Sequence, residues 1–254
     1  MSEETLGLPF DIHGGGMDLT FPHHENEIAQ SCGAHGEDED PKKFVHYWIH
    51  NAMLNIDGEK MSKSLGNISY IRDYLKKHHG EILRLALLSG HYRQSINWSN
   101  ETIEHSKNIL DKFYRILNKV SEIKIEKDAI KTCPQKILTA LCDDLNTSKA
   151  LAELNEISKK LSTATDYDSQ TKYKTELLSA AKVFGILEEP PKKWLGIGQI
   201  QDNLDGEFIE QLIKERTESR LSKNFQRADE IRHELSDLGI EIEDTPNGTI
   251  WRVK

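Results

Sequence analysis

The spacing of hydrophobic and polar positions changes along the chain, and it separates three kinds of region. Residues 1–70 have no single hydrophobic period and are rich in glycine and histidine. Their apolar stretch FVHYWIHNAMLNI fits a helix or a strand, and Asp57-Gly58 after it is expected to form a turn. Residues 71–190 carry apolar side chains at helical spacing in several blocks. Residues 206–254 contain two helical blocks and then two short strands around TPNG, a hairpin signal.

Several element ends can be predicted from single residues. Ser99 is a good N-cap for the helical block that follows it, and Gly185 and Gly239 are placed to end two later helices. Residues 191–205 are expected to be a linker by composition. The pattern therefore predicts a partial α/β region, then a mainly helical bundle, then a small α+β domain.

Composition narrows the functional classes. The chain has 254 residues and a net charge of −9, which disfavours a general nucleic-acid binder held by bulk positive charge, and no DNA partner is expected. Three cysteines without a disulfide or CxxC spacing fit a reducing compartment. No apolar run approaches the roughly 20 residues of a membrane span, and no signal peptide is recognisable, so a cytoplasmic location without membrane contact is expected.

The segment PHHENE has the spacing of a metal site. Pro22 suits the first turn of a helix, and a helix starting there would put His23 and Glu27 on one face, one turn apart. Such a pair can reach one metal ion. The same residues also fit a polar helix start, where glutamate is favoured by the helix dipole. The spacing alone leaves both interpretations open.

Two further segments suggest phosphate or nucleotide chemistry. In HGGGMD, consecutive glycines such as Gly15 allow close backbone approach to a ligand, and Asp18 is placed to accept hydrogen bonds from a ribose; a tight loop with a capping aspartate is the alternative. In EKMSKSLGN, Lys60 and Lys63 lie in a positive loop that can stabilise charge on a phosphate chain. A lysine pair alone is more often simply solvated.

These strings together resemble one enzyme family. KMSKS is the signature loop of class I aminoacyl-tRNA synthetases, and FDIHGGGMDLTFPHHENEIAQS and YWIHNAM resemble the cysteinyl-tRNA synthetases. RADEIRHELSDLGIEIEDTPNGTIWR is similar to that family's C-terminal anticodon-reading domain. The resemblance covers essentially the whole chain. It implies a Rossmann-like catalytic part over residues 1–70, a helical tRNA-side domain over 71–190 and an anticodon-recognition domain over 206–254.

The resemblance implies an activity and its cofactors. The family activates cysteine with ATP and Mg²⁺ to cysteinyl-adenylate and transfers it to the 3′ end of tRNA(Cys). A zinc ion binds the cysteine thiolate, and because a hydroxyl is a poorer zinc ligand, serine is rejected. Cysteine, ATP and tRNA(Cys) are therefore the expected partners.

The resemblance also gives roles to individual residues. The implied roles are catalysis for Lys60 and Lys63, ATP binding for Lys63, Gly15 and Asp18, the cysteine pocket for His13 and His50, zinc binding for His23 and Glu27, and anticodon contacts for Phe225, Asp229, Arg232 and Asp244. For the anticodon contacts, an aromatic offers a stacking face to unpaired bases. The mixed charges of FQRADEIRHEL are equally typical of a solvated helix face.

One departure from the family pattern is conspicuous. Residues 1–254 contain no HIGH-type string, and none of the three cysteines aligns with the family's two zinc cysteines. The chain is expected to be the C-terminal portion of such an enzyme, inactive in adenylation by itself, with a separate N-terminal half as a candidate partner. Two alternatives remain open: a non-catalytic tRNA-binding remnant, and a ligase joining cysteine to an amino sugar in mycothiol synthesis, which should not need the anticodon domain.

Overall fold

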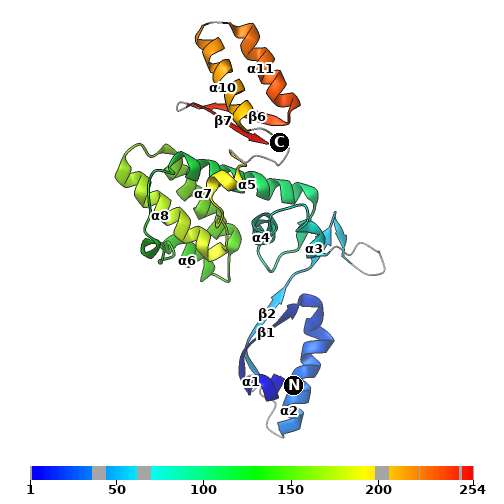
Figure 1. The fold of residues 1–254 in the computed structure, drawn as a ribbon. Helices are drawn as coiled ribbons and strands as arrows, with labels where there is room; N and C mark the ends of the chain where they lie inside the picture. Colours follow the sequence, from blue (N-terminus) through cyan, green and yellow to red (C-terminus); the bar gives the residue numbers. More distant parts are fainter. Residues whose placement is uncertain are drawn as a thin grey trace. The chain divides into compact units, whose positions relative to one another are not determined.

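The structure, a computed structural model, describes residues 2–35, 44–61, 70–197, 206–222, 224–245 and 248–253 (Figure 1). It divides into two compact units, which are described separately: residues 1–108 with 133–156, and residues 109–132 with 157–254.

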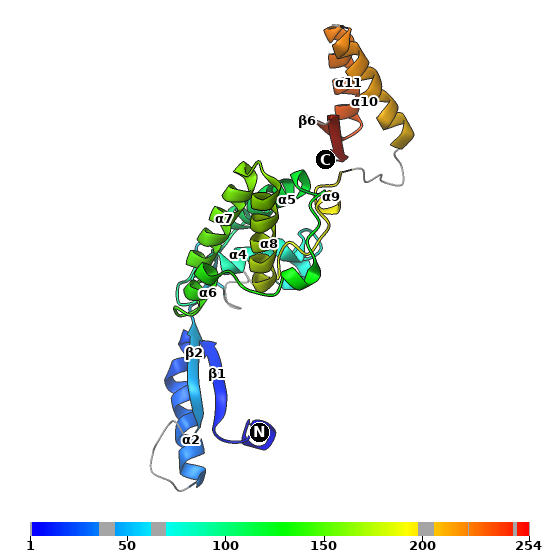
Figure 2. The same ribbon diagram turned by 90° about the vertical axis from the view of Figure 1, so that its left-hand side faces the viewer.

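The first unit begins with a strand–helix–strand arrangement. β1 (Phe10–Gly16) pairs in parallel with β2 (Val45–Asn51), and α2 (Glu25–His35) lies between them in the chain and alongside them in space (Figures 1 and 2). A parallel pair requires a crossover of this kind. Phe10, Phe44 and Val45 form its buried core, and Ile28 of α2 packs against it. A short helix, α1 (Ser2–Leu6), precedes β1.

The helix expected to start at Pro22 begins later. A single 3-10 turn, η1 (Met17–Leu19), and a wide π-type turn, η2 (Thr20–His24), come before α2. Within η2, Phe21 is extended, with φ −136° and ψ 135°. The residue before a proline is pushed away from helical geometry, so Phe21 forms a kink that separates the preceding turn from the wide helical turn at residues 22–24.

The same unit continues with a second small sheet. β3 (Leu54–Ile56) pairs antiparallel with β4 (Glu59–Lys60) and in parallel with β5 (Ile96–Trp98). Asp57 and Gly58, with φ of 50° and 87°, make the predicted turn between β3 and β4. Because β5 completes this sheet, the α/β region extends well past residue 70, at which it was expected to end. The remaining helices here are α3 (Ile71–Tyr74), α4 (Gly80–Leu88) and α6 (Gln135–Leu141).

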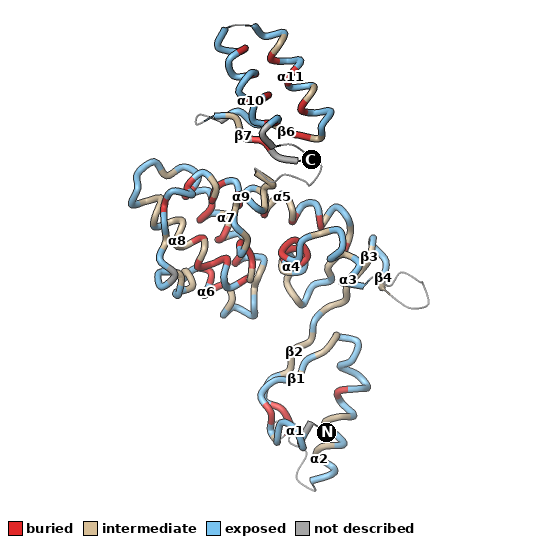
Figure 3. Tube along the Cα trace, in the orientation of Figure 1, coloured by how far each residue is buried: buried red, intermediate tan, exposed pale blue. Residues whose placement is uncertain are grey.

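Long helices follow, as predicted. α5 (Asn100–Lys119) and α7 (Thr147–Thr163) each cross a limit between the two units, and α8 (Tyr167–Phe184) belongs to the second, as does the short turn η4 (Lys127–Ala129). Buried positions recur along α4, α6, α7 and α8 (Figure 3). Gly185 ends α8 in the left-handed conformation, as its position in the sequence indicated.

The first part of the predicted linker is folded. α9 (Pro191–Trp194) is held to α5 by Trp194, whose ring stacks on Tyr114 at 4.4 Å between centroids. The Trp194 indole N–H also donates to Asp111 Oδ1 at 2.8 Å. Residues 198–205 of the linker lie outside the described residues.

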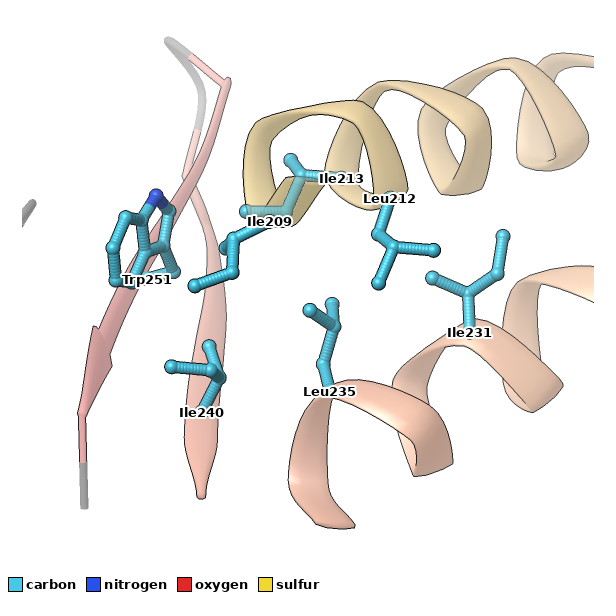
Figure 4. Close-up of a cluster of buried hydrophobic side chains, with 7 residues drawn as sticks. All are labelled: Ile209, Leu212, Ile213, Ile231, Leu235, Ile240 and Trp251. Atoms are coloured by element: carbon cyan, nitrogen blue, oxygen red, sulfur yellow. The ribbon is translucent and has the colours of Figure 1, made fainter. Parts of the chain in front are cut away.

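The C-terminal domain has the predicted α+β form. α10 (Gly206–Leu221) and α11 (Phe225–Asp237) pack on the antiparallel hairpin of β6 (Ile240–Thr245) and β7 (Gly248–Val253). Its core gathers side chains from all four elements (Figure 4): Ile209, Leu212, Ile213, Ile231, Leu235, Ile240 and Trp251. Together the three regions confirm the predicted fold class. Among the described helices, none has the length and apolar character that crossing a membrane requires.

Candidate functional site

Histidines and a glutamate gather where β1, β2 and the start of α2 meet. His13 comes from β1, His50 from the end of β2, His24 from the turn before α2, and Glu27 from the first turn of α2. Parallel strands commonly present ligand-binding groups at their carboxyl ends. The parallel register places His13 beside Trp48 and Gly15 beside His50.

Glu27 lies at the centre of this group. Its Oε2 is 3.1 Å from His13 Nε2, and its Oε1 is 3.5 Å from His23 Nε2. Glu27 Oε2 is buried and, among the described residues, has no hydrogen-bond partner, since the approach of His13 is close but not hydrogen-bonded. A buried carboxylate oxygen without a donor is costly unless a cation is near. This oxygen therefore suits a metal ligand.

His24 is the buried member of the group. It is 3% exposed, and its Nδ1 is 2.8 Å from His50 Nε2. The rings of His13 and Trp48 lie 4.9 Å and 5.0 Å away between centroids. Burial lowers the pKa of His24, and the neighbouring imidazoles of His13 and His50 lower it further. The neutral imidazole that results is the form that binds metals.

Close packing explains the glycines of this segment. A Cβ on Gly15 would lie 2.9 Å from His24 Cε1, and a Cβ on Gly14 would lie 3.2 Å from the Ile49 carbonyl oxygen. A Cβ on Gly16 would meet the Asp18 carboxylate at 2.5 Å. The glycines therefore allow His24, the Ile49 carbonyl and the Asp18 carboxylate to lie close to the backbone of β1. This packing role is independent of any contact with a nucleotide.

The geometry supports a metal set that overlaps the predicted one. His13, His24 and Glu27 can each offer one ligand atom, all within 4.8 Å of one another. Nitrogen and carboxylate oxygen are zinc ligands, and three protein ligands with an open position are typical of catalytic zinc. Glu27 belongs to the predicted pair. His23 touches it, but its side chain is 57% exposed. The sequence analysis did not name His24 as a possible metal ligand. The adjacent histidines His23 and His24 were the feature of the sequence that could have suggested it.

The lysines of the signature loop cannot be placed in this geometry. Lys60 ends β4, but its side chain lies outside the described residues, as does the whole of Lys63. The polar loop 36–43 also lies outside them.

The four predicted anticodon residues fall into two groups. Phe225 is 61% exposed at the start of α11, and Asp229 and Arg232 are exposed on the same helix. Asp229 also lines a surface hollow of about 770 Å³, where Glu230 and Glu234 make the wall acidic.

Asp244 differs because its carboxylate is engaged within the domain. Buried Arg216 donates to both of its oxygens at 2.8 and 2.9 Å, Arg220 donates to Oδ2, and the Thr249 hydroxyl donates to Oδ1 at 2.8 Å. The hydrogen bonds from Arg216 hold the pKa of Asp244 far below its usual range. The structure therefore shows that these bonds engage Asp244 within the domain, although its side chain is still 45% exposed, whereas the other three candidates lie exposed on α11.

Family comparisons match the chain in three segments. Residues 1–108 match the tRNA synthetases class I (C) catalytic domain, residues 136–188 the DALR domain, and residues 206–252 the cysteinyl-tRNA ligase anticodon binding domain. The first match extends to residue 108, which agrees with the sheet that includes β5.

Relatives of known name cover the whole chain. The cysteine–tRNA ligase of Parvibaculum lavamentivorans is 44% identical over 255 residues, covering 100% of this chain and 53% of the relative. That of Rhodospirillum rubrum is 46% identical over 253 residues, covering 99% and 54%. The chain thus spans about half the length of the curated relatives it matches.

A solved structure shares the fold. The LeuRS of the Agrobacterium radiobacter K84 agnB2 ternary complex LeuRS-tRNA-LeuAMS aligns with a TM-score of 0.51 at 19% identity, over 74% of this chain and 26% of that one. At this identity the likeness concerns the fold alone.

Proposed function

We propose that this chain, which belongs to the cysteine–tRNA ligase family of class I aminoacyl-tRNA synthetases, contributes to activating cysteine with ATP and Mg²⁺ and to transferring it to the 3′ end of tRNA(Cys). The observation that carries the proposal is the group of His13, His24 and Glu27, which lies beside a parallel strand pair. It occurs within the segment that matches the catalytic domain of the family.

In this proposal Glu27 binds zinc together with histidines. The resemblance assigns His23 to the metal, whereas the geometry offers His13 and His24. A bound zinc ion supplies a position that a cysteine thiolate fills far better than a serine hydroxyl. His50 orients His24 through the 2.8 Å contact between their rings and lines the cysteine pocket beside it.

The nucleotide side of the site rests on a second group of residues. Lys60 and Lys63 of the signature loop stabilise charge on the phosphates of ATP. Gly15 and Asp18 lie near the adenosine. Since residues 1–254 contain no HIGH-type string, we expect the phosphate clamp to need residues that this sequence does not contain.

Binding of tRNA(Cys) is assigned to the last domain. Phe225 offers an exposed ring on which an anticodon base can stack, and Asp229 and Arg232 offer groups for base edges on the same helix. The proposal keeps Asp244 as a fourth candidate, whose outward reach is limited by its bonds to Arg216.

The test is cysteine-dependent ATP–pyrophosphate exchange, measured with zinc content on the purified chain alone and after mixing with the N-terminal half of the Rhodospirillum rubrum relative. We expect exchange, and about one zinc ion per complex, only after mixing. Mixing that restores neither would contradict the proposed activity. If tRNA(Cys) still bound, the chain would be a non-catalytic binding remnant.

The zinc ligands can be distinguished in the same mixture. Glu27→Gln should remove zinc, and the effects of His23→Ala and His24→Ala decide between the two ligand sets. His46→Ala is the matched control, because His46 is an exposed histidine on β2. With cobalt in place of zinc, the visible absorption of the ion reports its ligands directly. Zinc retained in full by Glu27→Gln would overturn the assignment.

A further inference from the structure

Trp48 joins the hydrophobic core of the strand pair to the candidate site. It lies on β2, is half-buried, and packs against the core formed by Phe10, Phe44 and Val45. Its ring centroid is 6.0 Å from that of Phe44. An indole offers one N–H donor and none of the side-chain atoms that bind zinc. Any contribution of Trp48 to a metal site is therefore made through its neighbours.

The same indole is in contact with three histidines of the site. Its ring centroid lies 4.8 Å from that of His13, 5.0 Å from that of His24 and 5.8 Å from that of His50. The rings of Trp48 and His50 are nearly parallel, with 4° between their planes, and the other two pairs are tilted by 41° and 43°. Ring centroids about 4.5–7 Å apart are typical of favourable aromatic pairs. Among the described residues outside this group, no other ring contacts all three imidazoles.

Hydrogen bonds alone fix these imidazoles incompletely. In the described part of the chain, the 2.8 Å contact between His24 Nδ1 and His50 Nε2 is the one hydrogen bond that either ring makes. His13 Nε2 approaches Glu27 at 3.1 Å without bonding to it. The ring torsion of histidine is broad, and a metal-binding histidine usually gains its orientation from a carboxylate or carbonyl on its second nitrogen. Here the second nitrogen of His24 meets another imidazole, which itself needs a support.

We infer that Trp48 is a positioning residue of the candidate site, whose indole holds the imidazoles of His13, His24 and His50 at fixed mutual orientations. The inference deepens the proposed function and rests on it, because the group that Trp48 holds is the one proposed to bind the metal and the cysteine. Side chains alternate along a strand, so Trp48 and His50 project from the same face of β2. A large ring with two torsions loses little conformational freedom when it supports other groups.

The first experiment measures how firmly His24 is held, and it needs no metal. Diethyl pyrocarbonate modifies neutral, accessible imidazoles, and mass spectrometry of peptides gives the rate at each histidine. In the purified, metal-free full chain, His24 is 3% exposed and should react slowly. His105 on α5 is exposed and serves as the internal standard. A buried group becomes accessible through local opening, so the rate at His24 reports the stability of its packing.

Two substitutions of Trp48 separate its ring from its apolar bulk. Trp48→Leu keeps an apolar side chain without the ring, and the rate at His24 should rise about tenfold relative to His105. Trp48→Phe keeps a ring and should hold the rate within about twofold of wild type. Tyr47→Leu is the matched control, because it removes a neighbouring ring of β2 that is 68% exposed, and it should leave the rate at His24 unchanged.

A further variant tests whether any loosening of the core has the same effect. Val45→Ala removes two methyl groups from the core against which Trp48 packs, and Val45 is only 2% exposed. Val45→Ala therefore destabilises the strand pair but leaves the indole beside the imidazoles. The rise in rate at His24 should be clearly smaller than in Trp48→Leu.

The second experiment measures the metal in the mixture with the N-terminal half of the Rhodospirillum rubrum relative. Cobalt should bind Trp48→Leu about tenfold more weakly than wild type, which is the lower end of the loss expected for residues that orient metal ligands. The visible bands of bound cobalt report the geometry of its ligands. They should therefore shift in Trp48→Leu and return to the wild-type positions in Trp48→Phe.

Three results would each overturn the inference: an unchanged rate at His24 in Trp48→Leu, an equal rise in Val45→Ala, or an unchanged cobalt affinity and spectrum in Trp48→Leu. If the wild-type mixture bound no cobalt, the proposed zinc site would fail instead. The modification rates, which are measured without metal, would still decide whether Trp48 holds the histidines.

Discussion

The C-terminal domain depends on Asp244, and replacing it with alanine should destabilise that domain. The Asp244 carboxylate receives two hydrogen bonds from the Arg216 guanidinium, which is 8% exposed, and one from the Thr249 hydroxyl. In Asp244→Ala, Arg216 remains buried without its counter-charge. Leaving one partner of a buried ion pair uncompensated typically costs about 3–5 kcal/mol.

The partial exposure of Asp244 makes the expected loss of stability smaller than this range. The Asp244 side chain is 45% exposed, so water can reach the space left by the carboxylate and solvate Arg216 in part. We therefore expect a loss of about 2 kcal/mol. A single small core rarely supplies more than about 3–5 kcal/mol, so the loss is a large fraction of the stability of this domain. The corresponding drop in its unfolding temperature is on the order of 10 °C.

Hydrogen exchange read by mass spectrometry on the full chain can measure this loss locally. Protection should fall along β6 and β7 and stay unchanged in the first unit. Asp237→Ala, which removes an exposed carboxylate from α11, is the matched control. Replacing both partners, in Arg216→Met with Asp244→Ala, should recover most of the loss because no buried charge remains. A double variant as unstable as the single one would refute the reasoning.

The same ion pair predicts a pH dependence. The hydrogen bonds from Arg216 depress the pKa of Asp244 in the folded domain, so the stabilisation is fully present above the usual value near 3.8. It is lost as the pH falls through the folded-state pKa, below that value. The difference in stability between wild type and Asp244→Ala should therefore shrink below about pH 4 and stay constant above about pH 5. A difference that grows on acidification would contradict the assignment.

Three further predictions concern other packed positions. Gly15→Ala should lower the metal affinity about tenfold, measured by titration with cobalt in place of zinc, because the new Cβ displaces the His24 ring. Unchanged affinity would show that His24 is not a metal ligand. Trp194→Ala should lower the free energy of unfolding of the full chain in urea by about 2 kcal/mol, and Trp194→Phe by about 1, because phenylalanine still stacks on Tyr114; equal losses would exclude the stacking. Lys174→Met should cost about 1–2 kcal/mol in the same assay, because its ammonium donates to the carbonyls of Val120 and Ile123 just after α5. The same change at an exposed lysine of α8 should cost nothing measurable.

Features determined by nearby residues were predictable from the sequence. Asp57-Gly58 forms the expected turn, and the Ser99 hydroxyl accepts from the Thr102 N–H at 3.2 Å at the start of α5. Gly185 and Gly239 end their helices with positive φ, as expected. Each of these depends on the conformational range or hydrogen bonding of one residue and its neighbours, which the sequence states directly.

Features determined by distant residues were not predictable in the same way. The pairing of β5 with β3 joins residues about forty positions apart, and the sequence pattern around residue 70 gives no sign of it. His24 was missed for the same reason. Its burial comes from β2, where Trp48 and His50 project from alternate positions of the strand onto the turn before α2. The spacing within PHHENE says nothing about a strand twenty-five residues away.

The candidate metal-binding group is held in place by the chain's own contacts. His50 fixes one nitrogen of His24, packing on Gly15 fixes the ring, and burial keeps that ring neutral. Glu27 brings a buried carboxylate oxygen to the same place, and no group in the described part of the chain donates a hydrogen bond to offset its desolvation. A buried carboxylate oxygen is costly without a positive group beside it, so the local free energy favours a cation at this position. Zinc affinity should therefore follow Glu27 more steeply than any one histidine, since each imidazole contributes a donor atom but only Glu27 contributes charge.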